Sequence, residues 1–213
     1  MVDFEELDHE ALFEEAWVGA GHTAVELPAV DVNRVLRERY EVRPAVEFTA
    51  TSLWDMEARK AAAPDKYLPN VVKPGSVEWF PGARRGAFQY FTRVSEQRLW
   101  LDPTTFGVVI EHGRLDHAGR RAFFLGVERF RATDGREFVA GTGQPLFHVE
   151  HSVAGTQEEP LNLWRIVHLT ERPDPAMAAF FAEMGRERYL REFNEVYLRE
   201  DLNRSLERRS VLV

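Results

Sequence analysis

The sequence predicts an α+β fold in which a curved antiparallel sheet of about six to seven strands wraps around a long C-terminal helix. The middle of the chain holds short segments rich in β-branched and aromatic residues, and the turn Thr133-Asp-Gly135 separates two of them as in a hairpin. Near the end, apolar residues recur at helical spacing from Phe180 to Tyr197, after an N-cap at Asp174 and a proline at the first helical position. A sheet wrapped around such a helix leaves space for a small hydrophobic ligand.

Residues 1–44 are expected to form an N-terminal helical segment. Apolar residues recur along one side of residues 3–21, and Gly19-Ala-Gly21 ends that helix. His22 follows at once, and Glu26 lies four residues further on. The two side chains share a face if this short piece is helical.

The sheet is expected over residues 45–170, with a helical excursion at residues 52–67 that ends near prolines. The final helix covers residues 174–208, and the absence of repeats and linkers predicts one domain over residues 1–213. This order predicts a helix-grip (START/Bet v 1-like) fold; the competing α+β barrel places its helices first and usually ends on a strand. The expected strands are residues 45–51, 77–80, 86–94, 98–101, 106–112, 120–132, 137–152 and 161–170.

The composition excludes several classes of function. The net charge of −8 argues against general nucleic-acid binding, which needs a basic face. The chain has no cysteine, so disulfides, thiolate nucleophiles and thiolate-bound metal clusters are excluded. No apolar run approaches the roughly 20 residues that cross a bilayer, and the acidic N-terminus lacks a signal-peptide pattern. We therefore expect a cytoplasmic protein without a membrane partner.

Asp201 is the most unusual residue of the predicted last helix. Steps of four residues lead from Phe193 to Tyr197 and then to Asp201, which places a carboxylate on the buried stripe. A buried carboxylate is costly unless something pairs with it. Asp201 is therefore salt-bridged to one of several nearby arginines, exposed by a frayed helix end, or a ligand in a functional site.

A series of short motifs marks the C-terminal third: His148-Val-Glu-His151, Leu163-Trp-Arg-Ile-Val-His168, Asp174-Pro-Ala-Met177, Tyr197-Leu-Arg-Glu-Asp201 and Leu206-Glu-Arg-Arg209. Together they resemble the end of the catalytic domain of Rieske non-haem iron oxygenases, above all the branch that includes dicamba and vanillate demethylases. In that family the aspartate of a Glu-Asp pair on the last long helix binds iron, which implies this role for Asp201.

The resemblance is incomplete towards the N-terminus. The family's first histidine ligand matches His22, but its second, five residues later, is Leu27 here. The acidic residue that the family keeps three before the first histidine is Gly19. The iron–sulfur domain that precedes the catalytic domain is missing as well, so a separate electron-transfer protein would have to supply electrons.

The implied cofactor is a mononuclear Fe(II), which such enzymes hold with two imidazoles and one carboxylate. His22 and Asp201 would supply two ligands, and Glu26 would have to be the third. In the alternative interpretation, His22 packs against the last helix and Asp201 pairs with it or with an arginine.

His148 is the third catalytic candidate, beside Asp201 and His22, because an imidazole titrates near neutral pH. It shares a strand face with Glu150, whereas His151 points to the opposite face. The expected lining of the substrate pocket is the set Phe88, Tyr90, His148, Trp164, Phe193 and Tyr197.

Three classes of function remain. The first is an oxidoreductase that hydroxylates or demethylates a small hydrophobic or aromatic compound at iron, as a homo-oligomer like the trimers of that family. The second is a metal-free helix-grip cyclase, aromatase or isomerase of secondary metabolism, in which a histidine or aspartate is the acid or base. The third is a carrier that only binds a hydrophobic molecule.

Overall fold

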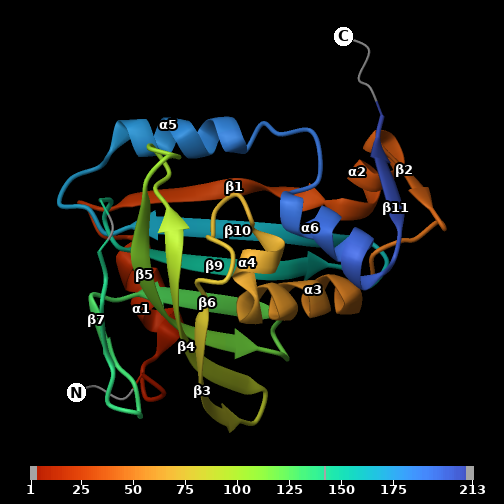
Figure 1. The fold of residues 1–213 in the computed structure, drawn as a ribbon. Helices are drawn as coiled ribbons and strands as arrows, with labels where there is room; N and C mark the ends of the chain where they lie inside the picture. Colours follow the sequence, from red (N-terminus) through yellow and green to blue (C-terminus); the bar gives the residue numbers. More distant parts are fainter. Residues whose placement is uncertain (1–3, 142, 210–213) are drawn as a thin grey trace.

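The centre of the molecule is an antiparallel sheet of seven strands in the order β1-β10-β9-β6-β5-β4-β3 (Figure 1). The computed structural model describes residues 4–141 and 143–209. Two smaller sheets pair β2 with β11 and β7 with β8. The strands are β1 Thr23–Asp31, β2 Tyr40–Arg43, β3 Glu78–Arg85, β4 Phe88–Arg98, β5 Phe106–Asp116, β6 Arg121–Gly126, β7 Arg129–Arg131, β8 Glu137–Val139, β9 Phe147–Gly155, β10 Pro160–His168 and β11 Ser205–Arg208.

Helices cover both faces of the sheet. Figure 1 shows α3 and α6 in front of the strands, α1 behind them and α5 along β1. Side-chain caps start several of these helices: Asp8, Asp31 and Thr49 each accept a hydrogen bond from a backbone N–H of the first turn. The helices are α1 His9–Trp17, α2 Val32–Arg39, α3 Ala50–Ala62, α4 Pro64–Tyr67, α5 Pro175–Met184, α6 Glu192–Val196 and the π-helical turn η1 Tyr197–Asp201.

The two faces of the sheet bury different clusters. We call the face under α3 and α6 the inner face; its largest buried side chains include Phe91, Phe124 and Ile166. The outer face lies under α1, where Phe13 packs against Phe123. Because side chains alternate along a strand, each residue of the sheet belongs to one face only. The sheet therefore separates the residues packed under α3 and α6 from those packed under α1.

The predicted α+β helix-grip class is confirmed: a curved antiparallel sheet carries helices against its inner face. The hairpin at Thr133-Asp-Gly135 forms between β7 and β8, and Gly135 adopts the positive φ of 89° that such turns require. Asp174 caps α5, accepting hydrogen bonds from the backbone of Ala176 and Met177. Among residues 4–141 and 143–209, no helix is both long and apolar enough to cross a membrane.

The helix predicted over residues 174–208 is not continuous. It ends after α5 at Gly185, where a Cβ would lie 2.9 Å from Cδ of Pro28, and it resumes as α6 and η1. Tyr40 holds the intervening segment, because its hydroxyl accepts a hydrogen bond from the backbone N–H of Leu190. The last residues then form β11 rather than helix. Contacts with distant parts of the chain therefore interrupt the predicted helix and leave two separate helical segments, α5 and α6 with η1.

Three N-terminal expectations are corrected as well. The piece after His22 is strand β1, which pairs with β10 and brings the N-terminal segment into the sheet. Residues 45–51 are not a strand, because the side chain of Asn33 makes hydrogen bonds to the backbone N–H and C=O of Phe48 that a neighbouring strand would otherwise make. The helix expected at 52–67 is split into α3 and α4.

Candidate functional site

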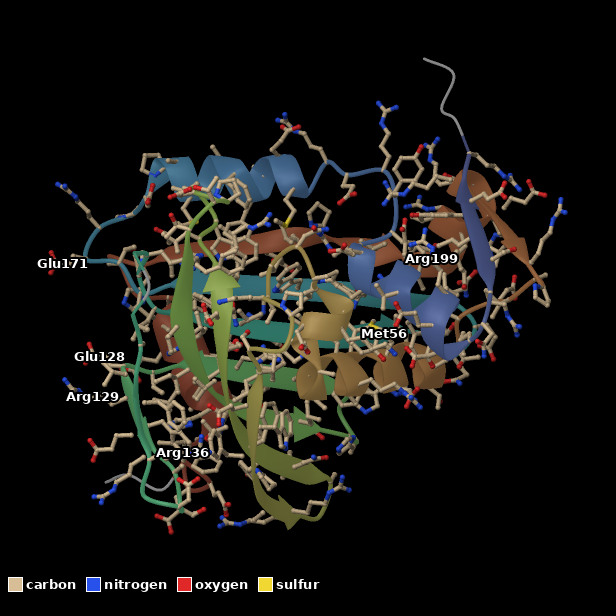
Figure 2. The ribbon with its side chains drawn as sticks, in the orientation of Figure 1. Met56, Glu128, Arg129, Arg136, Glu171 and Arg199 are labelled. Carbon is tan, nitrogen blue, oxygen red and sulfur yellow. The ribbon has the colours of Figure 1, made fainter. Side chains whose placement is uncertain are left out.

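Helix α3 carries two charged side chains into the interior of the protein. Glu57 and Lys60 lie four residues after Leu53 and Met56, on the stripe that faces the sheet. Met56, labelled in Figure 2, is fully buried on the same helix. The Glu57 and Lys60 side chains are only 1% and 2% exposed, and Lys60 Nζ lies 2.6 Å from Glu57 Oε2. Burial of an ion pair this deep is costly and is not needed for packing.

His151 on β9 completes a triangle with this pair. Lys60 Nζ lies 2.6 Å from His151 Nδ1, and that nitrogen lies 3.0 Å from Glu57 Oε2. A single ring nitrogen cannot accept from the ammonium and donate to the carboxylate at once. The three groups therefore have two alternative hydrogen-bonding patterns, which differ in where one proton lies.

Neighbouring side chains hold the triangle in place. Asn162 on β10 donates a hydrogen bond of 2.9 Å to the other carboxylate oxygen of Glu57. The ammonium of Lys60 also lies 3.7 Å from the centre of the Phe193 ring, a cation–π contact. A second buried ion pair, Arg93 with Glu111 at 2.6 Å, lies on the same inner face. The cluster is therefore ordered from both the sheet and the helices.

Burial and mutual charge shift the pKa values of the triangle. Burial lowers the pKa of Lys60 to about 8, although Glu57 opposes this shift. Burial also lowers the pKa of His151 to about 4, with the charge of Lys60 acting in the same direction. For Glu57 burial alone would raise the pKa, but Lys60 and His151 outweigh it and lower the pKa to about 2. At neutral pH the triangle thus holds a carboxylate, a neutral imidazole and a lysine close to its titration point.

A small cavity of about 40 Å³ borders the triangle on the inner face. His151 lines it together with Trp100 and Trp164, and Leu68 and Val71 close it from the segment after α4. Trp164 is the direct cross-strand neighbour of His151, and their ring centroids are 4.8 Å apart. The indole Nε1 atoms of both tryptophans are buried without a hydrogen-bond partner in the described part of the chain. Such donors favour a ligand with a hydrogen-bond acceptor.

Asp201 lies elsewhere and is salt-bridged. Its carboxylate, 12% exposed, is 2.9 Å from Lys66 Nζ and 3.6 Å from a nitrogen of Arg59. Tyr67 donates a further hydrogen bond of 2.7 Å. Burial would raise the pKa of Asp201, but the hydrogen bonds from Lys66 and Tyr67 lower it. These partners lie on α3 and α4, and none of them is one of the arginines that lie near Asp201 in the sequence. Asp201 therefore fastens the last turn to α3 and α4.

The iron site expected from His22, Glu26 and Asp201 is not assembled. His22 Nδ1 contacts the carbonyl of Ala16 at 2.8 Å, beside the end of α1. Glu26 is exposed on β1. In this extended strand its Cα lies roughly 10 Å from that of Thr23, the residue after His22, so Glu26 and His22 do not share a helical face as expected. Within the described ranges, no three His, Asp or Glu residues are grouped as metal ligands. As placed in the structure, the three residues do not fit a facial triad of two imidazoles and one carboxylate.

The expected pocket residues are divided between the two faces. His148, on the outer face, accepts a hydrogen bond of 3.2 Å from the backbone of Gly126. Burial lowers its pKa, and the nearby His22 acts in the same direction. Phe88 and Tyr90 belong to the outer face too, since Tyr90 contacts the His9 ring. The inner-face members are Trp164, Phe193 and Tyr197.

The sequence contained a usable indication of the inner cluster. The stepping by four that drew attention to Asp201 also places Glu57 and Lys60 on the apolar stripe of α3. The prediction that His148 and His151 face opposite sides is correct. Which of these two histidines points toward α3 and α6 depends on the order of the strands in the sheet, and the local sequence does not encode that order.

Comparisons with known proteins reveal similarity in structure only. No family model matches the chain, and no curated protein matches it, so the resemblance to Rieske oxygenases gains no support there. The Zhui aromatase/cyclase from Streptomyces sp. R1128 superposes with a TM-score of 0.48 at 14% identity, over 84% of this chain and 95% of that one. Norcoclaurine synthase from Thalictrum flavum gives 0.38 at 12%, over 79% and 89%. Ara h 8.0201 gives 0.43 at 9%, over 78% and 96%. Similarity at this level assigns no activity.

Proposed function

We propose that the chain is a metal-free enzyme that moves a proton next to a carbonyl group of a small hydrophobic or aromatic compound, the step shared by isomerases and by cyclases that close rings through an enolate. The observation that carries the proposal is the buried triangle of Glu57, Lys60 and His151. Strongly shifted, mutually coupled titratable groups beside a cavity are typical of catalytic sites.

The proposed chemistry uses the second nitrogen of His151. Nε2 makes no hydrogen bond within the described residues, and the ring lines the cavity. Nε2 takes the proton from the carbon next to the carbonyl, while Nδ1 passes its own proton to the neutral amine of Lys60. The electron pair left on carbon moves to the carbonyl oxygen, which accepts a hydrogen bond from the indole of Trp164. Return of the proton to another carbon, or attack of the enolate on a second carbonyl, completes the reaction.

The size of the cavity bears on what enters it. A space of about 40 Å³ accepts the carbonyl group, not a whole substrate. The remaining part of the compound would displace Leu68 and Val71, which belong to the segment between α4 and β3 that has neither helix nor strand. An apolar substrate body suits these side chains.

Deuterium exchange next to a carbonyl tests the proposal without knowledge of the natural substrate. The protein is incubated in D₂O with a panel of aryl ketones, cyclic ketones and β-dicarbonyl compounds, and exchange is followed by proton NMR. We expect at least one compound to exchange faster with the wild-type protein than with Glu57→Gln/Lys60→Met, a double variant that removes both buried charges. The exchange rate should rise with pH to a plateau above about 8, where Lys60 becomes neutral.

Two controls complete this experiment. Lys73→Met removes an exposed lysine that pairs with Glu96 and should leave the exchange rate unchanged. Lys60→Arg keeps a permanent positive charge and should abolish exchange. Equal rates for the wild type and the double variant across the panel would refute the proposed function.

A further inference from the structure

An apolar pocket lies on the outer face of the sheet, away from the triangle. Its volume is about 530 Å³, within the range of roughly 300–1,000 Å³ usual for small-ligand sites. The N-terminal segment, β3, β5 and the β7–β8 hairpin all contribute to its walls. None of the residues proposed for proton transfer lines it.

Aromatic rings form the wall of this pocket. The Phe4 and His112 rings stack with centroids 5.0 Å apart and 16° between their planes. Phe80 meets Phe130 edge-on at 5.0 Å, and Phe130 lies 5.8 Å from His112. Thr92 fixes the His112 ring through a hydrogen bond of 2.8 Å at Nδ1. Burial lowers the pKa of His112 to about 4, so the wall is uncharged at neutral pH.

The rim of the pocket carries positive charge. Arg129, labelled at the edge of the hairpin in Figure 2, lines the pocket and has no acidic partner in the described part of the chain. Arg131, on the same strand, has as its acidic partner among the described residues only the exposed Glu137, at 3.8 Å. By contrast, Arg136 is paired with Glu78 and Asp134. Arg129 is therefore a cation available to a ligand at the mouth of an apolar pocket.

We propose that this outer pocket binds a small amphiphilic carboxylate, with its ring or short acyl body among Phe4, Phe80 and Phe130 and its carboxylate paired with Arg129. The aromatic wall favours an apolar body, and the unpaired guanidinium favours an anionic end over a neutral one. Since the sheet separates this pocket from the inner cavity, both sites can be occupied together. The proposal does not depend on the proposed enzymatic function.

Isothermal titration calorimetry with 2-naphthoate and its neutral analogue 2-naphthamide tests this site. We expect 2-naphthoate to bind with one site per chain. Arg129→Gln should weaken 2-naphthoate about two- to fivefold, the range for an exposed ion pair, and leave 2-naphthamide unchanged. Arg188→Gln, which removes another exposed arginine without a partner in the described residues, is the matched control and should change neither.

Two pocket variants separate this site from the interior. Phe130→Ala enlarges the pocket and Val127→Phe fills it, and each should weaken both compounds at least tenfold, with near-UV circular dichroism confirming the fold. Glu57→Gln/Lys60→Met should leave both affinities unchanged. Absence of saturable 2-naphthoate binding would overturn the proposal. So would equal effects of the two arginine variants, or unchanged binding to folded Phe130→Ala and Val127→Phe.

Discussion

Removal of the Lys60 charge should destabilise the protein far more than removal of any exposed charge. In Lys60→Met the carboxylate of Glu57, 1% exposed, would keep only Asn162 at 2.9 Å and His151 at 3.0 Å as partners. Breaking a buried ion pair from one side costs about 3–5 kcal/mol, because an uncompensated charge remains. Since His151 can take up a proton and restore part of the compensation, we expect a loss of about 3 kcal/mol at pH 7.

Urea unfolding followed by tryptophan fluorescence measures this loss. Glu57→Gln/Lys60→Met, which keeps an amide to pair with Asn162, should return to within about 1 kcal/mol of the wild type. Lys73→Met, the exposed control, should change the free energy of unfolding by less than about 1 kcal/mol. The reasoning fails if Lys60→Met unfolds at the same urea concentration as Lys73→Met, or if the double variant is no more stable than Lys60→Met.

Two further predictions concern acid stability and the role of Asp201. Burial lowers the pKa of four histidines from 6.5 to about 4, so the unfolded chain binds more protons between these values and stability falls as pH falls through that window. Unfolding titrations at pH 7 and pH 5 should differ by several kcal/mol, up to about 1.4 kcal/mol per pH unit for each histidine, and equal stability would contradict the assigned burial. Asp201→Ala should cost about 1–2 kcal/mol in urea unfolding, since the hydrogen bonds of Lys66 and Tyr67 are lost. Glu200→Ala, 57% exposed, is its control, and equal losses would mean that Asp201 does not fasten the last turn. The four histidines of the acid-stability prediction are His9, His112, His151 and His168.

Features set by local chemistry could be predicted from the sequence. The Asp174 cap and the Gly135 turn each depend on neighbouring residues, and both form as predicted. The alternation along β9 correctly separated His148 from His151. Such features need only the periodicity and conformational preferences of a few residues.

Features set by distant contacts could not be predicted in this way. The break after α5 depends on the approach of Gly185 to Pro28, more than 150 positions earlier in the chain. The site depends on the register that places His151 beside Trp164 and on the packing of Lys60 against β9. The ion pair between Asp201 and Lys66 could not be predicted for the same reason, because motif spacing carries no information about a partner on α4.

The pKa of Lys60 tests the central claim most directly. The chain has only three lysines, Lys60, Lys66 and Lys73, so protein labelled with ¹³Cε-lysine gives three signals, and Lys66→Arg and Lys73→Arg assign them. The account predicts that the Lys60 signal titrates near pH 8, well below the ordinary lysine value of 10.5. Titration of Lys60 near 10.5, as for a solvent-exposed lysine, would contradict the account. The amine would then already be protonated near neutral pH and could not accept a proton from His151.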